Sequence, residues 1–224
     1  KMLFYLMMSP FQTFLKEFEQ SIISAKRDIS EIEVIAVSKR KSVQEIKLVI
    51  DDNHLSYGEN QIQEIEKKWI DLRTLSQKLR LHFIGGIQSR KVKSIYTNCD
   101  VIHSLDRIKV VKLFSELEVQ HNRRKEYFIQ INTGDEFQKS GVIIADADEF
   151  ISNCIEKYNL NIVGLMCIPP LNENPQKHFN SLADMAKNFN LSSLSMGMSN
   201  DYEIALNCGA THIRIGTKIF GERN

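Results

Sequence analysis

The stretch Val34-Ile35-Ala36-Val37, followed at once by Ser38-Lys39, is the clearest strand signal in the chain. A short apolar run between polar residues is typical of a strand that is buried on both faces. Ser42 follows with Glu45 three residues later, and this capping-box spacing predicts the start of a helix. A buried strand followed directly by a helix is the repeating unit of parallel α/β folds.

The same alternation of strand and helix recurs through the rest of the chain. Seven further runs predict strands at 54–57, 81–84, 101–104, 127–131, 162–166, 193–196 and 212–215. Amphipathic stretches between them, such as 62–75, 108–119 and 145–158, predict helices. Eight strand-and-helix units in 224 residues predict a single TIM (β/α)8 barrel of the α/β class. A doubly wound sheet of five or six strands is the alternative.

An extra helix precedes the first strand. Ser9 and Pro10 predict its start, because a capping residue followed by proline is a common helix beginning. Its apolar face is expected to hold Phe11, Phe14, Leu15, Phe18 and Ile22. Residues 1–8 are too few to span a bilayer, and no small-residue cleavage site follows them. We therefore expect a short N-terminal extension at 1–8 and one barrel domain at 9–224.

Composition excludes several classes of protein. The chain is 42% hydrophobic and 25% charged, which is ordinary for a globular protein with a full core. Its 29 Lys and Arg nearly balance 28 Asp and Glu, so we expect no nucleic-acid partner and no membrane partner. The local cluster 123–125 is expected to be a solvated helix end or a loop before a strand. The four cysteines are Cys99, Cys154, Cys167 and Cys208. Their wide spacing argues against a metal site and suits a reducing, cytoplasmic location.

Functional residues of a barrel lie where its strands end, at the C-terminal face. After the last two strands, Gly197 and Gly216 let backbone N–H groups approach an anion, and Ser199 and Thr217 add hydroxyl donors. Ser199 or the asparagine after it is expected to cap the next helix, with Glu203 at the capping-box position. These residues predict a phosphate site, and two ordinary capped turns are the alternative.

Lys39 is the second chemical signal, because it follows the first strand and would lie at the barrel mouth. Desolvation and neighbouring cations lower the pKa of a lysine from about 10.4, which frees its amine to attack a carbonyl. The alternative is a lysine whose stem is packed and whose ammonium lies in water. Together with a phosphate site, such a lysine indicates a phosphorylated aldehyde held as a Schiff base.

Ten short motifs in one order resemble the pyridoxal 5′-phosphate (PLP) homeostasis family of PLP-binding proteins. They are AVSK (36–39), YGEN (57–60), HFIG (82–85), Gln88-Ser89 with Lys91, IQIN (129–132), KSG (139–141), GLM (164–166), SMGMS (195–199), RIGT (214–217) and IFG (219–221). The resemblance extends from Phe11 to Gly221. It implies the fold of the alanine racemase N-terminal barrel.

The resemblance also implies a role for each matched residue. Lys39 would form the Schiff base with PLP, and Arg214 would face the pyridine nitrogen. The remaining cofactor contacts would be Asn60 beside the cofactor, Met166 and Met198 near its ring, and Ser199, Gly216 and Thr217 at its phosphate. Two residues depart from the family pattern, Arg90 and Gly86. Both are expected to lie away from the lysine and the phosphate site, and to affect loop or partner behaviour.

The implied function is vitamin B6 and PLP homeostasis with little or no turnover, and with PLP-requiring apo-enzymes as further partners of a monomer. Arg214 stays protonated, so a nitrogen facing it accepts a hydrogen bond and the ring is a weak electron sink. The alternative is a PLP-dependent, racemase-like enzyme. Racemases of this fold use a second domain, which we do not expect after Asn224, and Tyr57 is the one tyrosine expected beside the mouth. A phosphosugar aldolase or isomerase barrel is less favoured, since aldolase lysines usually follow later strands.

Overall fold

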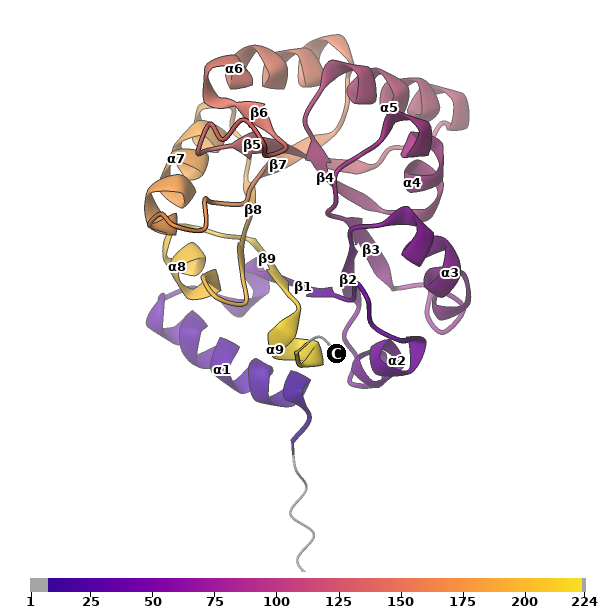
Figure 1. The fold of residues 1–224 in the computed structure, drawn as a ribbon, viewed down its shortest axis with the longest axis vertical. Helices are drawn as coiled ribbons and strands as arrows, with labels where there is room; N and C mark the ends of the chain where they lie inside the picture. The colour runs from indigo at the N-terminus through magenta and orange to yellow at the C-terminus, as the bar shows by residue number, and fades with distance from the viewer. Residues whose placement is uncertain (1–7, 223–224) are drawn as a thin grey trace, which may run out of the picture.

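Eight parallel strands close into a barrel with helices around the outside (Figure 1). This computed structural model describes residues 8–222. The hydrogen-bonded order is β4-β3-β2-β1-β9-β8-β7-β5, and β4 pairs with β5 to close the ring. The predicted (β/α)8 barrel is confirmed, and the doubly wound alternative is wrong.

All eight predicted strands are present. The barrel strands are β1 (Glu33–Val37), β2 (Ser56–Glu59), β3 (Arg80–Phe83), β4 (Val101–Leu105), β5 (Glu126–Asn132), β7 (Ile162–Cys167), β8 (Ser193–Met198) and β9 (His212–Ile215). A two-residue strand that the sequence did not predict, β6 (Val142–Ile143), pairs with the end of β5.

One helix, α1, precedes the first strand, and the other helices follow strands, as the sequence predicted. They are α1 (Pro10–Ser24), α2 (Val43–Asp51), α3 (Ile62–Leu72), α4 (Val92–Asn98), α5 (Ile108–His121), α6 (Ile144–Ser152), α7 (Pro175–Asn188), α8 (Tyr202–Asn207) and α9 (Thr217–Phe220). A π-helical segment, Asn153–Lys157, continues α6, and short 3-10 helices lie at Ile29–Glu31 and Ser89–Lys91.

Two predicted helix caps are confirmed. The Ser9 hydroxyl accepts a hydrogen bond from the Gln12 N–H at 3.1 Å at the start of α1. The Ser42 hydroxyl accepts one from the Glu45 N–H at 3.2 Å at the start of α2. Both ends are complete capping boxes, which satisfy backbone donors that a helix leaves unpaired.

The predicted cap of α8 is wrong. This helix begins at Tyr202, with Asp201 in the capping position and no side-chain cap. The Asp201 carboxylate instead accepts a hydrogen bond from the Met198 N–H at 2.6 Å, and the Asp201 N–H donates to the Met198 carbonyl at 3.1 Å. This turn keeps Ser199 out of the helix. Glu203 accepts from the Ser21 hydroxyl at 3.3 Å rather than from the helix start.

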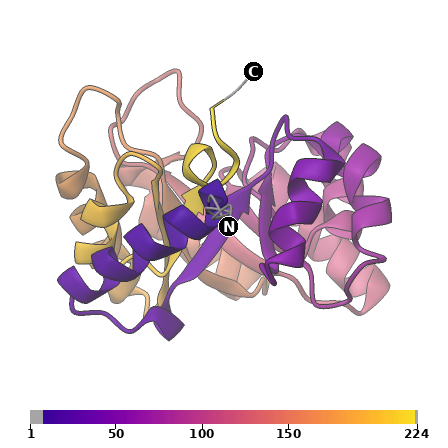
Figure 2. The same ribbon diagram turned by 90° about the horizontal axis from the view of Figure 1, so that it is seen from below.

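Helix α1 packs across α8 and α9, so the first and last parts of the chain lie together (Figures 1 and 2). Phe11, Phe14, Phe18 and Ile22 are each at most 4% exposed. Leu15, expected on the same face, is 40% exposed. The predicted extension lies outside the described residues, apart from exposed Met8, so the boundary at residue 8 stays a prediction.

The basic cluster 123–125 lies in the loop before β5, as expected, and Arg123 and Arg124 are exposed. Lys125 is buried, which the sequence did not predict. Its ammonium donates to the Cys99 carbonyl, and burial lowers the pKa of Lys125 to about 8. None of the helices within residues 8–222 has the length and apolar content that crossing a bilayer requires.

Candidate functional site

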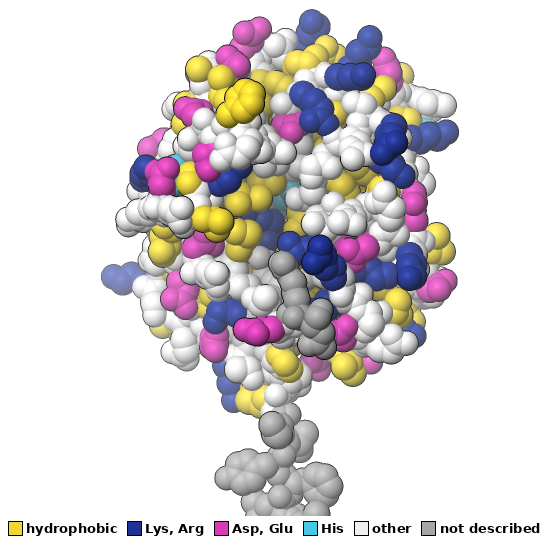
Figure 3. All heavy atoms as spheres, in the orientation of Figure 1, with side chains coloured by type: hydrophobic (Ala, Val, Ile, Leu, Met, Phe, Trp, Pro, Cys, Tyr) yellow, Lys and Arg dark blue, Asp and Glu magenta, His cyan; other side chains and the backbone are white. Residues whose placement is uncertain are grey.

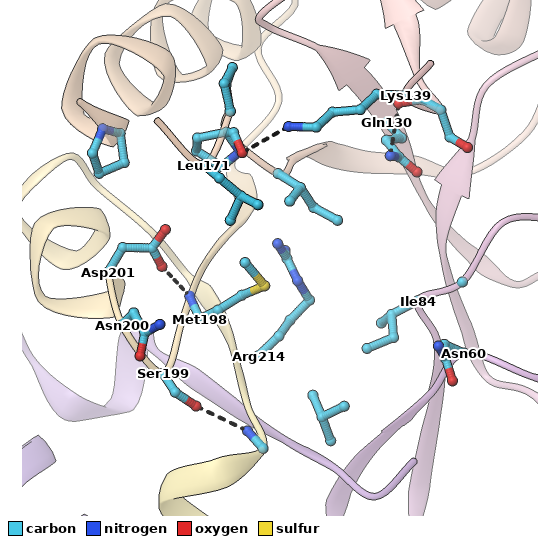
Figure 4. Close-up of a pocket in the computed structure, with 18 of the residues that line it drawn as sticks. Asn60, Ile84, Gln130, Lys139, Leu171, Met198, Ser199, Asn200, Asp201 and Arg214 are labelled. Atoms are coloured by element: carbon cyan, nitrogen blue, oxygen red, sulfur yellow. Dashed lines mark hydrogen bonds between the residues drawn. The ribbon is translucent and has the colours of Figure 1, made fainter. Parts of the chain in front are cut away.

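A cavity of about 770 Å³ opens at the C-terminal ends of the barrel strands. Figure 3 shows this face hollowed at its centre, and Figure 4 shows most of the lining residues. Seven of the eight residues that the sequence predicted line it: Lys39, Asn60, Met198, Ser199, Arg214, Gly216 and Thr217. The ends of strands far apart in sequence therefore meet around one space, as the barrel topology requires.

The structure does not bring Met166 to this cavity. Its side chain is fully buried and packs with Val101 and Phe128 in the barrel interior. Met166 precedes the last residue of β7, and the cavity wall on that side is formed by the loop that begins at Ile168. Met166 therefore belongs to the packed layer of the barrel interior rather than to the wall of the cavity.

Lys39 follows Ser38, the first residue after β1, and Ser38 is held in place by several hydrogen bonds. The Ser38 hydroxyl donates to Glu59 at 2.7 Å, and the Ser38 carbonyl accepts from the Lys68 ammonium at 2.9 Å. Lys68 and Glu59 form a buried ion pair at 2.6 Å. Burial raises the pKa of Glu59, and Lys68 opposes that change. Ser38 is thus fixed through both its side chain and its backbone, which sets where Lys39 enters the cavity.

The predicted phosphate residues gather on one side of the cavity. The Ser199 hydroxyl accepts a hydrogen bond from the Gly216 N–H at 3.4 Å (Figure 4). Gly216 caps α9, whose first intrahelical hydrogen bond comes from the Ile219 N–H. The Thr217 N–H and hydroxyl therefore stand at the helix beginning, together with the Ser199 hydroxyl. This group of donors suits an anion.

Arg214 extends into the middle of the cavity between Met198 and Ile84 (Figure 4). Only 4% of it is exposed. Its guanidinium donates to the Ser195 hydroxyl at 2.7 Å and to the Cys167 carbonyl at 2.9 Å. Burial lowers the pKa of Arg214 from its usual value. A cation thus lies at the centre of the site, held from below by the strands.

Two loops that the sequence did not assign to the site also form its wall. They are residues 133–141 and 168–174, which rise above the barrel in Figure 2. The Lys139 ammonium donates to the Pro169 carbonyl at 3.1 Å, so the loops are linked beside the cavity. Lys139 lies in the quoted KSG motif, which was the available signal.

The loop after β3 approaches the cavity more closely than expected. Gly86 lines the same cavity as Lys39, so the expectation that it lies away from the lysine is wrong. Arg90 is outside the lining and donates to the Gln88 side chain at 3.1 Å. A Cβ on Gly85 would lie 2.1 Å from the Asn60 carbonyl oxygen, so this close approach of two loops requires glycine.

Tyr57 does not lie beside the cavity, contrary to expectation. It is fully buried against Trp69, with ring centroids 5.0 Å apart, and its hydroxyl donates to the His54 carbonyl at 3.1 Å. Successive strand residues point to opposite faces, and Ser56 points into the barrel, where it donates to Glu33. Tyr57 therefore faces the helices.

No group of three or more possible metal ligands occurs among His, Cys, Asp and Glu within residues 8–222. All four cysteines are free thiols, and three of them are buried. Burial raises the pKa of Cys99, Cys154 and Cys167 to about 12. These thiols therefore stay protonated at neutral pH.

Sequence comparison relates the chain to known proteins. The family described as "Alanine racemase, N-terminal domain" matches residues 16–224. A pyridoxal phosphate homeostasis protein of Aquifex aeolicus is 39% identical over 176 residues, which are 75% of this chain and 76% of that protein. One from Escherichia coli is 34% identical over 207 residues, 88% of each chain.

Solved structures give the same relationship. PipY of Synechococcus elongatus, solved with PLP bound, is 28% identical, with a TM-score of 0.78 over 90% of this chain and 99% of that one. Alanine racemase of Clostridium difficile is 12% identical with a TM-score of 0.69, and the match covers 93% of this chain and 56% of that enzyme, so it shows the fold alone. The chain belongs to the alanine racemase N-terminal domain family and, within it, to the pyridoxal phosphate homeostasis proteins.

Proposed function

We propose that this protein binds PLP through a Schiff base to Lys39 and serves PLP homeostasis with little or no turnover. The observation that supports it is the meeting of three kinds of group in one cavity. These are a lysine, a central arginine, and the hydroxyl and N–H donors around Gly216. They match an aldehyde, a pyridine nitrogen and a phosphate. The relative PipY was solved with PLP bound.

The residues present fit this group. Lys39 and Ser199 line the same cavity, and Arg214 extends into its middle beside Met198 (Figure 4). The side-chain oxygen of Asn60 is buried without a hydrogen-bond partner among the described residues, so it is available to a ligand donor. When bound, PLP supplies an electrophilic carbonyl and an electron-accepting ring. Met198 provides an apolar contact beside Arg214.

Low turnover follows from the position of Arg214. A guanidinium is a donor only, so a ring nitrogen that faces it accepts a hydrogen bond and stays unprotonated. Such a ring stabilises a carbanion poorly. Tyr57, the tyrosine expected beside the cavity, is buried among the helices and cannot act as an acid or base there. The relatives are also named as homeostasis proteins rather than as enzymes.

The proposed setting of this role is the cytoplasm, where the protein acts as a monomer. PLP-requiring apo-enzymes are the proposed recipients of the cofactor. The balanced charge of the chain fits a small-molecule ligand rather than nucleic acid.

Deuterium exchange tests both parts of the proposal. The protein is loaded with PLP, checked by its visible absorption, and incubated in D₂O with each common amino acid while Cα exchange is followed by NMR. We expect a visible band and exchange far slower than the usual enzymatic range of about 1 to 1000 per second. Rapid exchange with inversion for any amino acid would establish the racemase-like alternative. Absence of the band would refute PLP binding.

A further inference from the structure

A continuous chain of hydrogen bonds runs through the barrel interior from Arg214 to Glu33. Arg214 donates to the Ser195 hydroxyl at 2.7 Å, and that hydroxyl lies 2.8 Å from Nδ1 of His103. His103 Nε2 lies 2.9 Å from Nδ1 of His82. His82 Nε2 lies 3.1 Å from Oε1 of Glu33. Ser195, His103 and His82 are completely buried.

The chemistry of the two ends fixes the direction of this chain. A guanidinium has no acceptor, so Ser195 must accept from Arg214. At the other end, Nε2 of His82 faces the Glu33 carboxylate, which has no donor, and the Ser56 hydroxyl at 2.9 Å. That hydroxyl donates to Glu33 at 2.7 Å, so both neighbours of Nε2 are acceptors and Nε2 carries the proton. If both rings are neutral, His82 Nδ1 accepts from His103 Nε2–H, and His103 Nδ1 accepts from the Ser195 hydroxyl. Every donor then points from the cation toward the anion.

The surroundings keep both rings neutral. Burial is the largest effect, and it lowers the pKa of His82 and that of His103. The charged and titratable groups around the pair are Glu33, which favours protonation, and Arg80, His212 and Arg214, which oppose it. His103 also stacks on Phe128 with ring centroids 4.3 Å apart, an apolar contact that holds its plane.

We propose that Ser195, His103 and His82 are positioning residues that form a one-directional relay and hold the Arg214 guanidinium in the cavity. The relay orients Arg214 because the Ser195 hydroxyl, with its proton committed to His103, presents its lone pairs to the guanidinium. The Cys167 carbonyl accepts a second hydrogen bond from the Arg214 guanidinium at 2.9 Å. The remaining N–H groups are left for the ligand. That they face a ring nitrogen rests on the proposed function.

The first test needs no ligand. Long-range ¹H–¹⁵N NMR on the wild-type protein at neutral pH reports which ring nitrogen carries the proton. We expect His82 and His103 both to be neutral with the proton on Nε2. A proton on Nδ1 of either ring, or an imidazolium at His82, would overturn the relay, since either reverses at least one link. This result stands whether or not PLP binds.

The second test asks whether the relay acts on the ligand. Ser195→Ala should weaken both PLP and pyridoxal about three- to tenfold, by loss of one hydrogen bond to Arg214. It should also move the His103 Nδ1 resonance to that of a nitrogen without a donor. Ser195→Thr, which keeps the hydroxyl, should restore both properties. The control is Ser115→Ala, which removes a hydroxyl that donates to the Tyr158 carbonyl outside the barrel. Ser195→Ala affinities equal to those of this control would overturn the positioning role.

Discussion

Ser38 shows how a buried ion pair fixes the residue that precedes Lys39. Glu59 and Lys68 hold its hydroxyl and its carbonyl, so the chain leaves β1 in one direction and delivers Lys39 to the cavity. A buried charge pair is costly to separate, and removal of one partner typically costs about 3 to 5 kcal/mol. The position of Lys39 therefore depends on Glu59 and Lys68, neither of which lines the cavity.

Thr217 tests the phosphate side of the cavity. Thr217→Val keeps the shape of the side chain and removes a hydroxyl donor, which should weaken PLP binding roughly ten- to hundredfold. Pyridoxal lacks the phosphate and should be less affected. Affinities for both ligands can be measured by absorption titration, with Thr97→Val on α4 as the control. Equal losses for the two ligands would count against a phosphate contact.

Residue positions were predictable where the strand ends are well marked. Lys39, Ser199, Gly216 and Thr217 each follow a buried apolar run, and barrel topology brings such positions together. Met166 was misplaced because a motif gives position along a strand but not depth within the barrel.

Gly85 and Gly86, which follow β3, differ in how closely the neighbouring chain approaches them. A Cβ on Gly85 would meet the Asn60 backbone oxygen at 2.1 Å, whereas one on Gly86 would meet only the Ser140 hydroxyl at 3.9 Å. A clash between this Cβ and a backbone oxygen cannot be relieved by a change of side-chain rotamer. Gly85 thus allows the loops after β2 and β3 to pack closely at the cavity.

We expect Gly85→Ala to lower the free energy of unfolding by about 1 to 3 kcal/mol or more, because it overpacks this contact. Gly86→Ala is the matched control and should be nearly neutral. Urea unfolding of the two variants measures the difference. Equal stability of the two proteins would contradict the close approach of the loops.

Helices and strands were predicted well where the periodic pattern of apolar residues extends over many residues, and poorly where the element is short. The Ser9 cap of α1 and the capping box of α2 are encoded within a few neighbouring residues, so both were predicted, whereas the part of Gln12 in the α1 capping box was not. The two-residue strand β6 is too short to carry any periodicity. The start of α8 depends on the Asp201 turn, whose acceptor role competes with the expected Ser199 cap.

At the scale of the whole molecule, histidines that are buried in the fold make the free energy of unfolding depend on pH. His82 and His103 have pKa values lowered by burial, and burial lowers that of His54 to about 4. In the unfolded chain a histidine protonates near pH 6.5. Protons are therefore taken up on unfolding, and stability present above pH 6.5 is lost as pH falls.

Each fully neutral buried histidine should cost about 2 kcal/mol of stability at pH 5 relative to neutral pH. Denaturant unfolding between pH 7.5 and 5 measures this loss. His103→Phe keeps a ring against Phe128 and should show a shallower dependence on pH, even if it is less stable overall. A free energy of unfolding that is flat over this range would show that the rings are not buried as neutral groups.

The central claim is that Lys39 holds PLP, and chemical trapping tests it most directly. PLP-loaded protein is reduced with borohydride, digested, and its peptides are mapped by mass spectrometry, with Lys39→Ala treated in parallel. We predict the pyridoxyl group on Lys39 and its loss in the variant. A group found mainly on another lysine that lines the cavity, such as Lys139, or undiminished trapping in Lys39→Ala, would contradict the account.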